Sequence, residues 1–219
     1  MRLPMACAAV VVGLAVGCGQ PAEPGPPAPQ PPAADIARPI DPARITRARS
    51  AVPPGYEFAP LPADPAPAAL WGLGPGWSAD PPQCAGLVTA PGAGARGWSA
   101  SGPGGIVYAV VTPASAAADP VLRDECAQWA VASARTTGTV TRIDTPAVPG
   151  ADSYGMAATL TTVVEGGTET RAEAATVLAH ADGYLVAVTV VADPGMPEPP
   201  LGPAFAAGLL TETVAVLRG

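Results

Sequence analysis

Few side chains in this 219-residue sequence could carry out nucleophilic catalysis, because it contains a single histidine, His180. A serine hydrolase would need that histidine as the general base for a serine hydroxyl. The stretch GWSASG places Ser99 in a Gly-x-Ser-x-Ser pattern, close to the Gly-x-Ser-x-Gly elbow, with Ser101 beside it. The elbow has a helix after the serine, whereas the residues that follow here predict a strand. We therefore expect His180 to be a solvated hairpin residue without a catalytic role. The alternative is a catalytic site in which His180 activates Ser99 or Ser101.

Cysteine chemistry indicates export from the cytoplasm. Cys18 follows a 12-residue apolar stretch, Met5–Val16, and Arg2 precedes that stretch. The stretch is too short to span a bilayer and is typical of a secretory signal. Its end, Ala15-Val16-Gly17-Cys18, resembles the bacterial lipobox, in which cleavage occurs just before a cysteine that carries a diacylglyceryl group. Residues 1–17 are then a lipoprotein signal peptide, and acyl chains on Cys18 anchor the protein to the membrane. An ordinary secretory signal with an unrelated cysteine is the competing interpretation.

The remaining cysteines form an even pair. Cys7 leaves with the signal and Cys18 carries lipid, so Cys84 and Cys126 are predicted to form a disulfide, as is common in exported proteins. This bond would close a loop of about 43 residues and contribute roughly 4 kcal/mol in the chain-entropy model. A metal site is not expected, because neither cysteine has a CxxC partner. No cofactor is expected either, since SGPGGI precedes a strand, whereas phosphate-binding loops follow one.

Tryptophans mark one more candidate site. Trp71, Trp77 and Trp98 lie in a glycine- and proline-rich region around Cys84, and Trp129 is close to the second cysteine of the pair. If the disulfide forms, these rings could converge. Two interpretations stay open: the rings are structural and cover a sheet, or they line an apolar or sugar-stacking cleft between a flap and that sheet.

Composition separates a spacer from a folded domain. Seven of the twelve residues from Pro21 to Pro32 are proline, so residues 18–39 are predicted to be a disordered spacer. After removal of Arg2 with the signal, ten arginines stand against 18 acidic residues, a net charge of −8 (10 − 18). This balance argues against nucleic acid as a partner. Residues 40–219 suffice for a single globular domain with its own core.

Periodicity predicts the elements that would position these side chains. Asp41–Ala51 has an N-cap aspartate followed by proline and predicts a helix. Asp119–Arg135 also predicts a helix, because Leu122, Cys126, Trp129 and Ser133 follow helical spacing. Residues 56–82 are expected to be irregular, and no convincing element is found over 71–98. Strands are predicted over 105–112, 139–144, 154–164, 169–180 and 184–192, with hairpin turns at Gly166-Gly167 and Asp182-Gly183 and a final helix over 204–218.

These elements predict an α+β fold. Its strands form a single twisted antiparallel sheet that ends in a C-terminal meander, and its helices pack on one face of the sheet. The disulfide would pin an irregular flap near Cys84 to the helix that carries Cys126.

The order of these features resembles a known family. A lipobox and a proline-rich spacer precede a short helix that ends in PPGYEFAPL, and PPQCAGL is followed by a strand. A helix with a central cysteine, DECAQWAVAS, precedes the meander and the final helix. This arrangement resembles the extracellular sensor-like domain of the mycobacterial PknH-type kinases and its lipoprotein relatives, over roughly Ile40–Gly219. The resemblance implies a binding or sensing module of the cell envelope, without a kinase part. The kinase ectodomain of that family has two disulfides and this chain can form one, so no functional residue is carried over.

Two hypotheses for the function follow. The first is a non-catalytic, lipid-anchored module on the extracytoplasmic side of the cell membrane. It would bind a small molecule, a lipid, a glycan or an envelope protein through the flap side. The second is a hydrolase that acts on envelope material through Ser99 or Ser101 and His180. The distance between His180 and these serines distinguishes the two, because the nucleophile and the base must be within hydrogen-bond reach.

Overall fold

The computed structural model describes residues 38–89, 94–114, 116–192 and 200–219. The predicted signal peptide, Cys18 and most of the predicted spacer lie outside these residues. The elements in chain order are η1 (Pro42–Ala51), β1 (Glu57–Ala59), α2 (Pro67–Leu70), β2 (Ser78–Asp80), η2 (Pro82–Leu87), β3 (Arg96–Gly102), β4 (Gly105–Pro113), α3 (Pro120–Glu125), β5 (Gln128–Ser133), β6 (Thr136–Ile143), β7 (Asp152–Val163), η3 (Glu165–Gly167), β8 (Glu169–Ala181), β9 (Tyr184–Ala192) and α4 (Pro203–Arg218).

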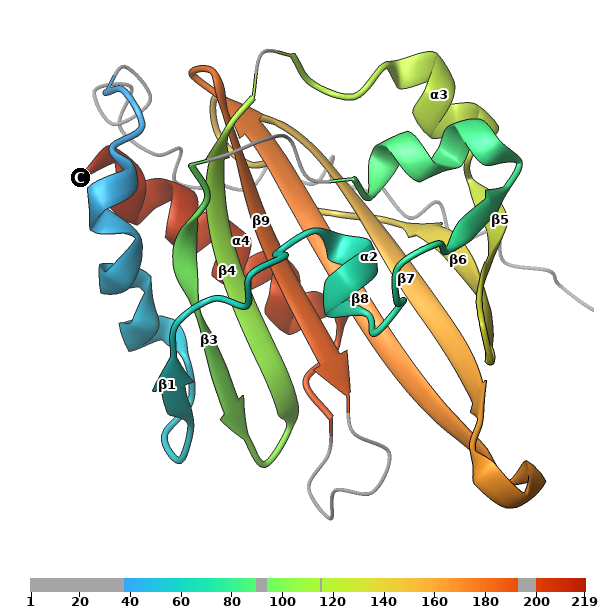
Figure 1. Ribbon diagram of the computed structural model, residues 1–219. Coiled ribbons are helices and arrows are strands. Elements are labelled where there is room, and N and C mark those ends of the chain that lie inside the picture. Colours follow the sequence, from blue (N-terminus) through green and yellow to red (C-terminus); the bar gives the residue numbers. More distant parts are fainter. Residues whose placement is uncertain (1–37, 90–93, 115, 193–199) are drawn as a thin grey trace, which may run out of the picture. The chain divides into compact units, whose positions relative to one another are not determined.

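The strands form one twisted sheet, which is drawn in Figure 1. Nine strands pair antiparallel in the order β1-β3-β4-β9-β8-β7-β6-β5-β2. The strands predicted from the sequence correspond to β4 and to the meander β6 to β9. The turn between β8 and β9 places Asp182 at φ 51° and Gly183 at φ 78°, the left-handed conformation that a two-residue hairpin favours. The predicted α+β fold is confirmed.

The helix face of the sheet, as we call the side that carries α4, is closed by α4 and η1 (Figure 1). Alternate residues of the central strands are buried under these two helices. They include Val107, Ala109, Val111, Val177, Ala179, Val186, Val188 and Val190. Helix α4 contributes Leu209, Leu210, Val214 and Leu217. The predicted N-terminal helix is the 3₁₀ helix η1, and its N-cap Asp41 accepts a hydrogen bond from the Ala43 amide at 3.0 Å.

The opposite side, the flap face, carries α2, η2, α3 and the segments that connect them, which we call the flap layer (Figure 1). Cys84 in η2 and Cys126 at the end of α3 form a disulfide with a Cα–Cα distance of 5.6 Å, as predicted. The layer buries a second core against the sheet. Its members include Trp71, Leu73, Leu87, Val88, Trp129, Val131, Val140, Met156 and Leu178. The central strands are therefore buried on both faces. Helices were predicted on one face only, but the short helices α2, η2 and α3 lie on the face opposite α4 and η1.

The predicted helix over Asp119–Arg135 is wrong beyond its first turns. Helix α3 ends at Glu125, and β5 begins at Gln128. Residues of β5 alternate between exposed and buried, and β5 pairs with β6 on one side and β2 on the other. The backbone groups of this segment thus take partners across the sheet in place of a helical ladder.

The region predicted to be irregular contains short elements. Residues 56–82 include β1, α2 and β2, each of three or four residues. Residues 71–98 also include η2 and the start of β3, a seven-residue strand between β1 and β4. The expectation of no strand or helix over 71–98 is therefore wrong.

Candidate functional site

The serine and histidine of the hydrolase hypothesis do not meet. The Ser99 hydroxyl donates to the Pro60 carbonyl at 3.1 Å, and His180 Nε2 lies 3.2 Å from a different backbone carbonyl. The sheet register places Ser99 level with Thr176, three strands away and four residues before His180. Strand spacing and rise therefore separate Ser99 from His180 by about 20 Å. Ser101 lies farther from the histidine along the same strand.

The tryptophans divide between the two faces of the sheet. Trp71 and Trp129 are buried in the same core cluster as the disulfide, and Trp77 is half-buried against that cluster. Trp98 lies on β3 and points to the helix face, where it is 0% exposed. The structure thus does not bring Trp71, Trp77 and Trp98 together. None of them lines the cavity described next, and a ligand contact by Trp71 or Trp77 stays a prediction.

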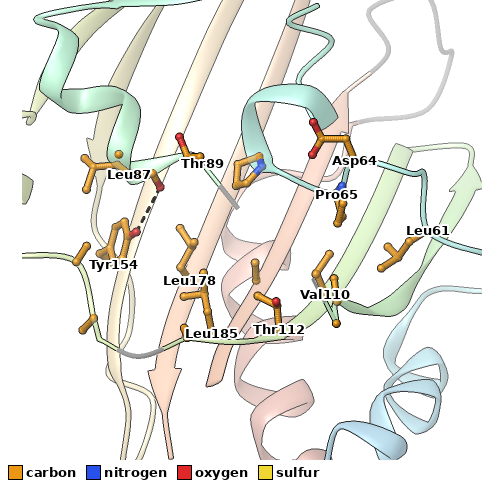
Figure 2. A pocket seen from close by; sticks show the side chains of 18 of the residues that line it. Leu61, Asp64, Pro65, Leu87, Thr89, Val110, Thr112, Tyr154, Leu178 and Leu185 are labelled. Atoms are coloured by element: carbon orange, nitrogen blue, oxygen red, sulfur yellow. Dashed lines mark hydrogen bonds between the residues drawn. The ribbon is translucent and has the colours of Figure 1, made fainter. Parts of the chain in front are cut away.

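A cavity of about 590 Å³ lies between the flap face of the sheet and the flap layer. Its walls are formed by residues between 61 and 67, by Gly86, Leu87 and Thr89, by 94–95 and by 116–118. Figure 2 shows Tyr154 and Leu61 at opposite ends of this flap cavity, with Leu178, Leu185 and Val110 between them. Volumes of this order are typical of small-molecule sites.

The floor of the flap cavity is a row of residues on four adjacent strands. Tyr154 on β7 pairs with Leu178 on β8, Leu178 pairs with Ala187 on β9, and Ala187 pairs with Val110 on β4. Side chains that face each other across antiparallel strands lie on the same face of the sheet. The floor is therefore continuous and apolar, except for the phenol at one end.

Polar groups are few among the described residues that line the cavity. Asp64 is the one charged side chain, and its Oδ1 accepts a hydrogen bond from the Ala66 amide at 3.0 Å. Thr89 and Thr112 contribute hydroxyl groups, and Thr89 donates to the Ala85 carbonyl at 2.8 Å. Such a lining favours an apolar ligand with a small polar part.

The Tyr154 end of the cavity carries a phenol that can donate a hydrogen bond. The Tyr154 hydroxyl donates to the Leu87 carbonyl at 3.4 Å, a long hydrogen bond. The Arg123 guanidinium lies 5.2 Å from the centre of the Tyr154 ring and forms a bidentate pair with Asp152 at 2.9 and 2.8 Å. Burial raises the pKa of Tyr154 to about 12, while Arg123 lowers it and Asp152 raises it. The phenol therefore stays protonated and can donate at physiological pH.

A buried polar contact fixes the flap layer on the sheet. Trp71 Nε1 donates to Thr176 Oγ1 at 2.9 Å, and the Thr176 and Thr189 hydroxyls lie 2.8 Å apart. Trp71 follows α2 directly, and Pro67 at the start of α2 lines the flap cavity. The contact thus sets the height of one cavity wall above the floor. Sequence analysis placed Trp71 in the flap but did not identify its threonine partner.

The cavity residues were not predicted from the sequence. Val110 and Leu178 fall within predicted strands and alternate with residues of the helix-face core. Such an unbroken apolar run is the local signal of a strand that is buried on both faces. That signal does not identify which residues lie side by side.

Over the described ranges, no three His, Cys, Asp or Glu side chains are placed to hold a metal ion. No helix in the described part of the chain is long and apolar enough to cross a membrane.

The fold is found in solved structures. An uncharacterised protein of Mycobacterium smegmatis, the Rv0999 ortholog, is 22% identical with a TM-score of 0.58, covering 82% of this chain and 98% of that chain. The extracellular domain of PknH from Mycobacterium tuberculosis is similar at 13% identity and a TM-score of 0.46, covering 82% and 97%. This second match is the kinase ectodomain that the sequence resembles. No curated protein matches this chain. The model of a domain of unknown function (DUF5642) matches residues 41–218, and the chain therefore belongs to this family.

Proposed function

We propose that this protein is a non-catalytic, sensor-like binding module of the cell envelope, and that the flap cavity is its ligand site. The observation that carries the proposal is the cavity of about 590 Å³ with a continuous apolar floor. Removal of apolar ligand surface from water would supply most of the affinity. The disulfide, which is common in exported domains, supports an extracytoplasmic location.

The test fills the cavity from its floor. Ala187 is 8% exposed and lies in the middle of the floor row, so Ala187→Phe would place a ring where the ligand is proposed to lie. We expect this variant to bind the apolar fluorescent probe 1-anilinonaphthalene-8-sulfonate at least tenfold more weakly than the wild type. Ala95→Phe, which enters from the wall, provides a second variant in case the first does not fold. Fluorescence titration of the probe gives the dissociation constants.

Ala132→Phe is the matched control, because Ala132 lies on β5, is exposed and does not line the cavity. It should bind the probe as the wild type does. Overpacking typically lowers the stability of a fold by about 1–3 kcal/mol. Thermal melting of the variants shows whether weaker binding reflects this loss of stability or the filled cavity. Equal binding by wild type and both cavity variants would exclude the flap cavity as the site, as would a wild type that does not bind the probe.

The lipid anchor is a second part of the proposal. Cys18→Ser should abolish incorporation of labelled palmitate and move the protein from the membrane fraction to the medium, because the acyl chains on Cys18 would be its attachment. Cys7→Ser is the matched control, since Cys7 precedes the proposed cleavage point, and it should leave labelling and attachment unchanged. Membrane retention of the Cys18→Ser variant, or labelling that persists in it, would contradict the anchor.

A further inference from the structure

The flap cavity runs across the strands and not along them. The floor row from Tyr154 through Leu178 and Ala187 to Val110 crosses β7, β8, β9 and β4. Three strand spacings make this row about 14 Å long. Figure 2 shows the labelled side chains following one another in this direction.

A glycine on the next strand extends the row. Val110 pairs with Gly97 on β3, so no side chain of β3 rises into the line. A Cβ atom at position 97 would come within 3.0 Å of Leu61 Cδ1 and within 1.9 Å of the Ala109 carbonyl oxygen, so a larger residue does not fit there. Leu61 lines the cavity over this position and closes its end. From Tyr154 to Leu61 the cavity spans four strand spacings, about 19 Å.

We infer that the ligand is a single linear acyl chain with a carboxylate or ester head, that the chain lies along the floor row, and that its head is at Tyr154. The inference rests on the proposed binding function and names the ligand class of the same site. A zigzag chain advances about 1.25 Å per carbon at C–C bond lengths near 1.5 Å. The cavity therefore matches a chain of about 14 to 16 carbons.

The two ends of the cavity determine the orientation of the chain. At one end the Tyr154 hydroxyl makes only a long hydrogen bond to the Leu87 carbonyl, and it can turn to donate to a head-group oxygen. The Arg123 guanidinium, which lies over the Tyr154 ring, adds positive charge at this end. Its ion pair with Asp152 offsets much of that charge. At the other end the Asp64 carboxylate would repel an acidic head. The methyl end of the chain then lies against Leu61.

The chain-length dependence of binding tests the shape of the ligand. Saturated fatty acids of about 8 to 18 carbons would displace the fluorescent probe from the wild-type protein. We expect affinity to rise about fourfold per methylene, the equivalent of ~0.8 kcal/mol for each buried methylene, up to about 14 to 16 carbons and then to level off. A compact apolar acid, 1-adamantanecarboxylate, should displace the probe at least tenfold less well than the acid of about 14 carbons.

Tyr154→Phe tests the head group. The variant keeps the ring and loses the donor, so fatty acids of every length should bind about three- to tenfold more weakly, with the chain-length slope unchanged. Tyr108→Phe is the matched control, because Tyr108 lies on β4 at a flap-face position and does not line the cavity. It should leave fatty-acid binding unchanged.

The outcomes separate the inference from the proposed function. If the probe binds and Ala187→Phe weakens it, but affinity does not depend on chain length or the compact acid competes equally, the acyl-chain inference is wrong and the binding function stands. If Tyr154→Phe binds the acids as the wild type does, the assigned orientation is wrong. Failure of the probe itself to bind overturns the proposed function.

Discussion

Trp98→Ala is expected to lower the free energy of unfolding by about 3–5 kcal/mol, the range for large buried truncations. Trp98 is 0% exposed on the helix face, and its Nε1 donates to the Ile45 carbonyl at 3.0 Å. The Phe58 ring meets it edge-on with centroids 5.3 Å apart. Truncation would leave a void between β3 and η1 and remove the hydrogen bond that joins them. Denaturant unfolding of the variant and the wild type measures the difference.

Trp77→Ala is the comparison, because Trp77 is half-buried at the edge of the flap-side core. It should lose clearly less stability than Trp98→Ala. Trp98→Phe keeps most of the volume and loses the N–H donor, so we expect about 0.5–1.5 kcal/mol from the lost hydrogen bond to the Ile45 carbonyl. A loss below about 1 kcal/mol for Trp98→Ala would contradict a core role for this residue.

The C-terminal half could be predicted because its signals are local. Tyr184–Ala192 is rich in β-branched residues, and Asp182-Gly183 supplies the positive φ angles of a tight hairpin. Strands joined by such turns pair with their sequence neighbours, so the order β6 to β9 follows from the chain itself. Helix α4 likewise has an apolar stripe that is visible at helical spacing.

The segment around Cys126 could not be predicted, because its apolar residues fit both the helical period of 3.6 residues and the strand period of two. Leu122, Cys126 and Trp129 follow helical spacing, while Trp129, Val131 and Ser133 alternate as a strand does. A six-residue stretch is too short for periodicity to decide between them. Pairing on both edges decides the outcome: β6 follows directly in the chain, whereas β2 is a distant partner more than 45 residues earlier. Such a contact leaves no local signal.

Strand β3 was missed for a related reason. Gly97, Ser99 and Ser101 form its flap-face side and are weak β-formers. Only Trp98 and Ala100 on the other side contribute to a core. The strand exists because β1 and β4 satisfy its backbone on both edges. Without β3, sequence reasoning placed Trp98 in the flap, on the opposite side of the sheet from its true position.

The candidate site depends on register, which the sequence does not show. Tyr154, Leu178, Ala187 and Val110 become neighbours only when β7, β8, β9 and β4 align as they do. A shift of one residue in any pair would exchange the faces and break the row. The register also places β4 next to β9, a pairing between strands that are not consecutive in the chain. Sequence analysis could suggest a cleft on the flap side but could not identify its lining.

Loss of the disulfide is expected to produce the second large effect. Cys84→Ser with Cys126→Ser should lower the free energy of unfolding by roughly 2–5 kcal/mol, because a loop of about 43 residues is no longer closed in the unfolded chain. The double variant avoids a leftover thiol. Because the disulfide joins Cys84 and Cys126 and both are buried at 2% exposure or less, the protein should contain no alkylatable thiol at either position when it is denatured without reductant. Two reactive thiols in that protein would contradict the pairing.

The same variant should affect the flap cavity more than the helix face. The disulfide ties η2 to the end of α3, and the cavity takes wall residues from η2, such as Leu87, and from the segment just before α3, such as Ala118. Without the bond these two walls move independently, so amide hydrogen exchange should rise over η2 and α3 while α4 stays protected. Binding of the apolar probe should weaken in parallel, and wild-type protein treated with reductant should behave in the same way. Equal deprotection of α4 would show instead that the disulfide stabilises the whole domain without a specific role in the cavity.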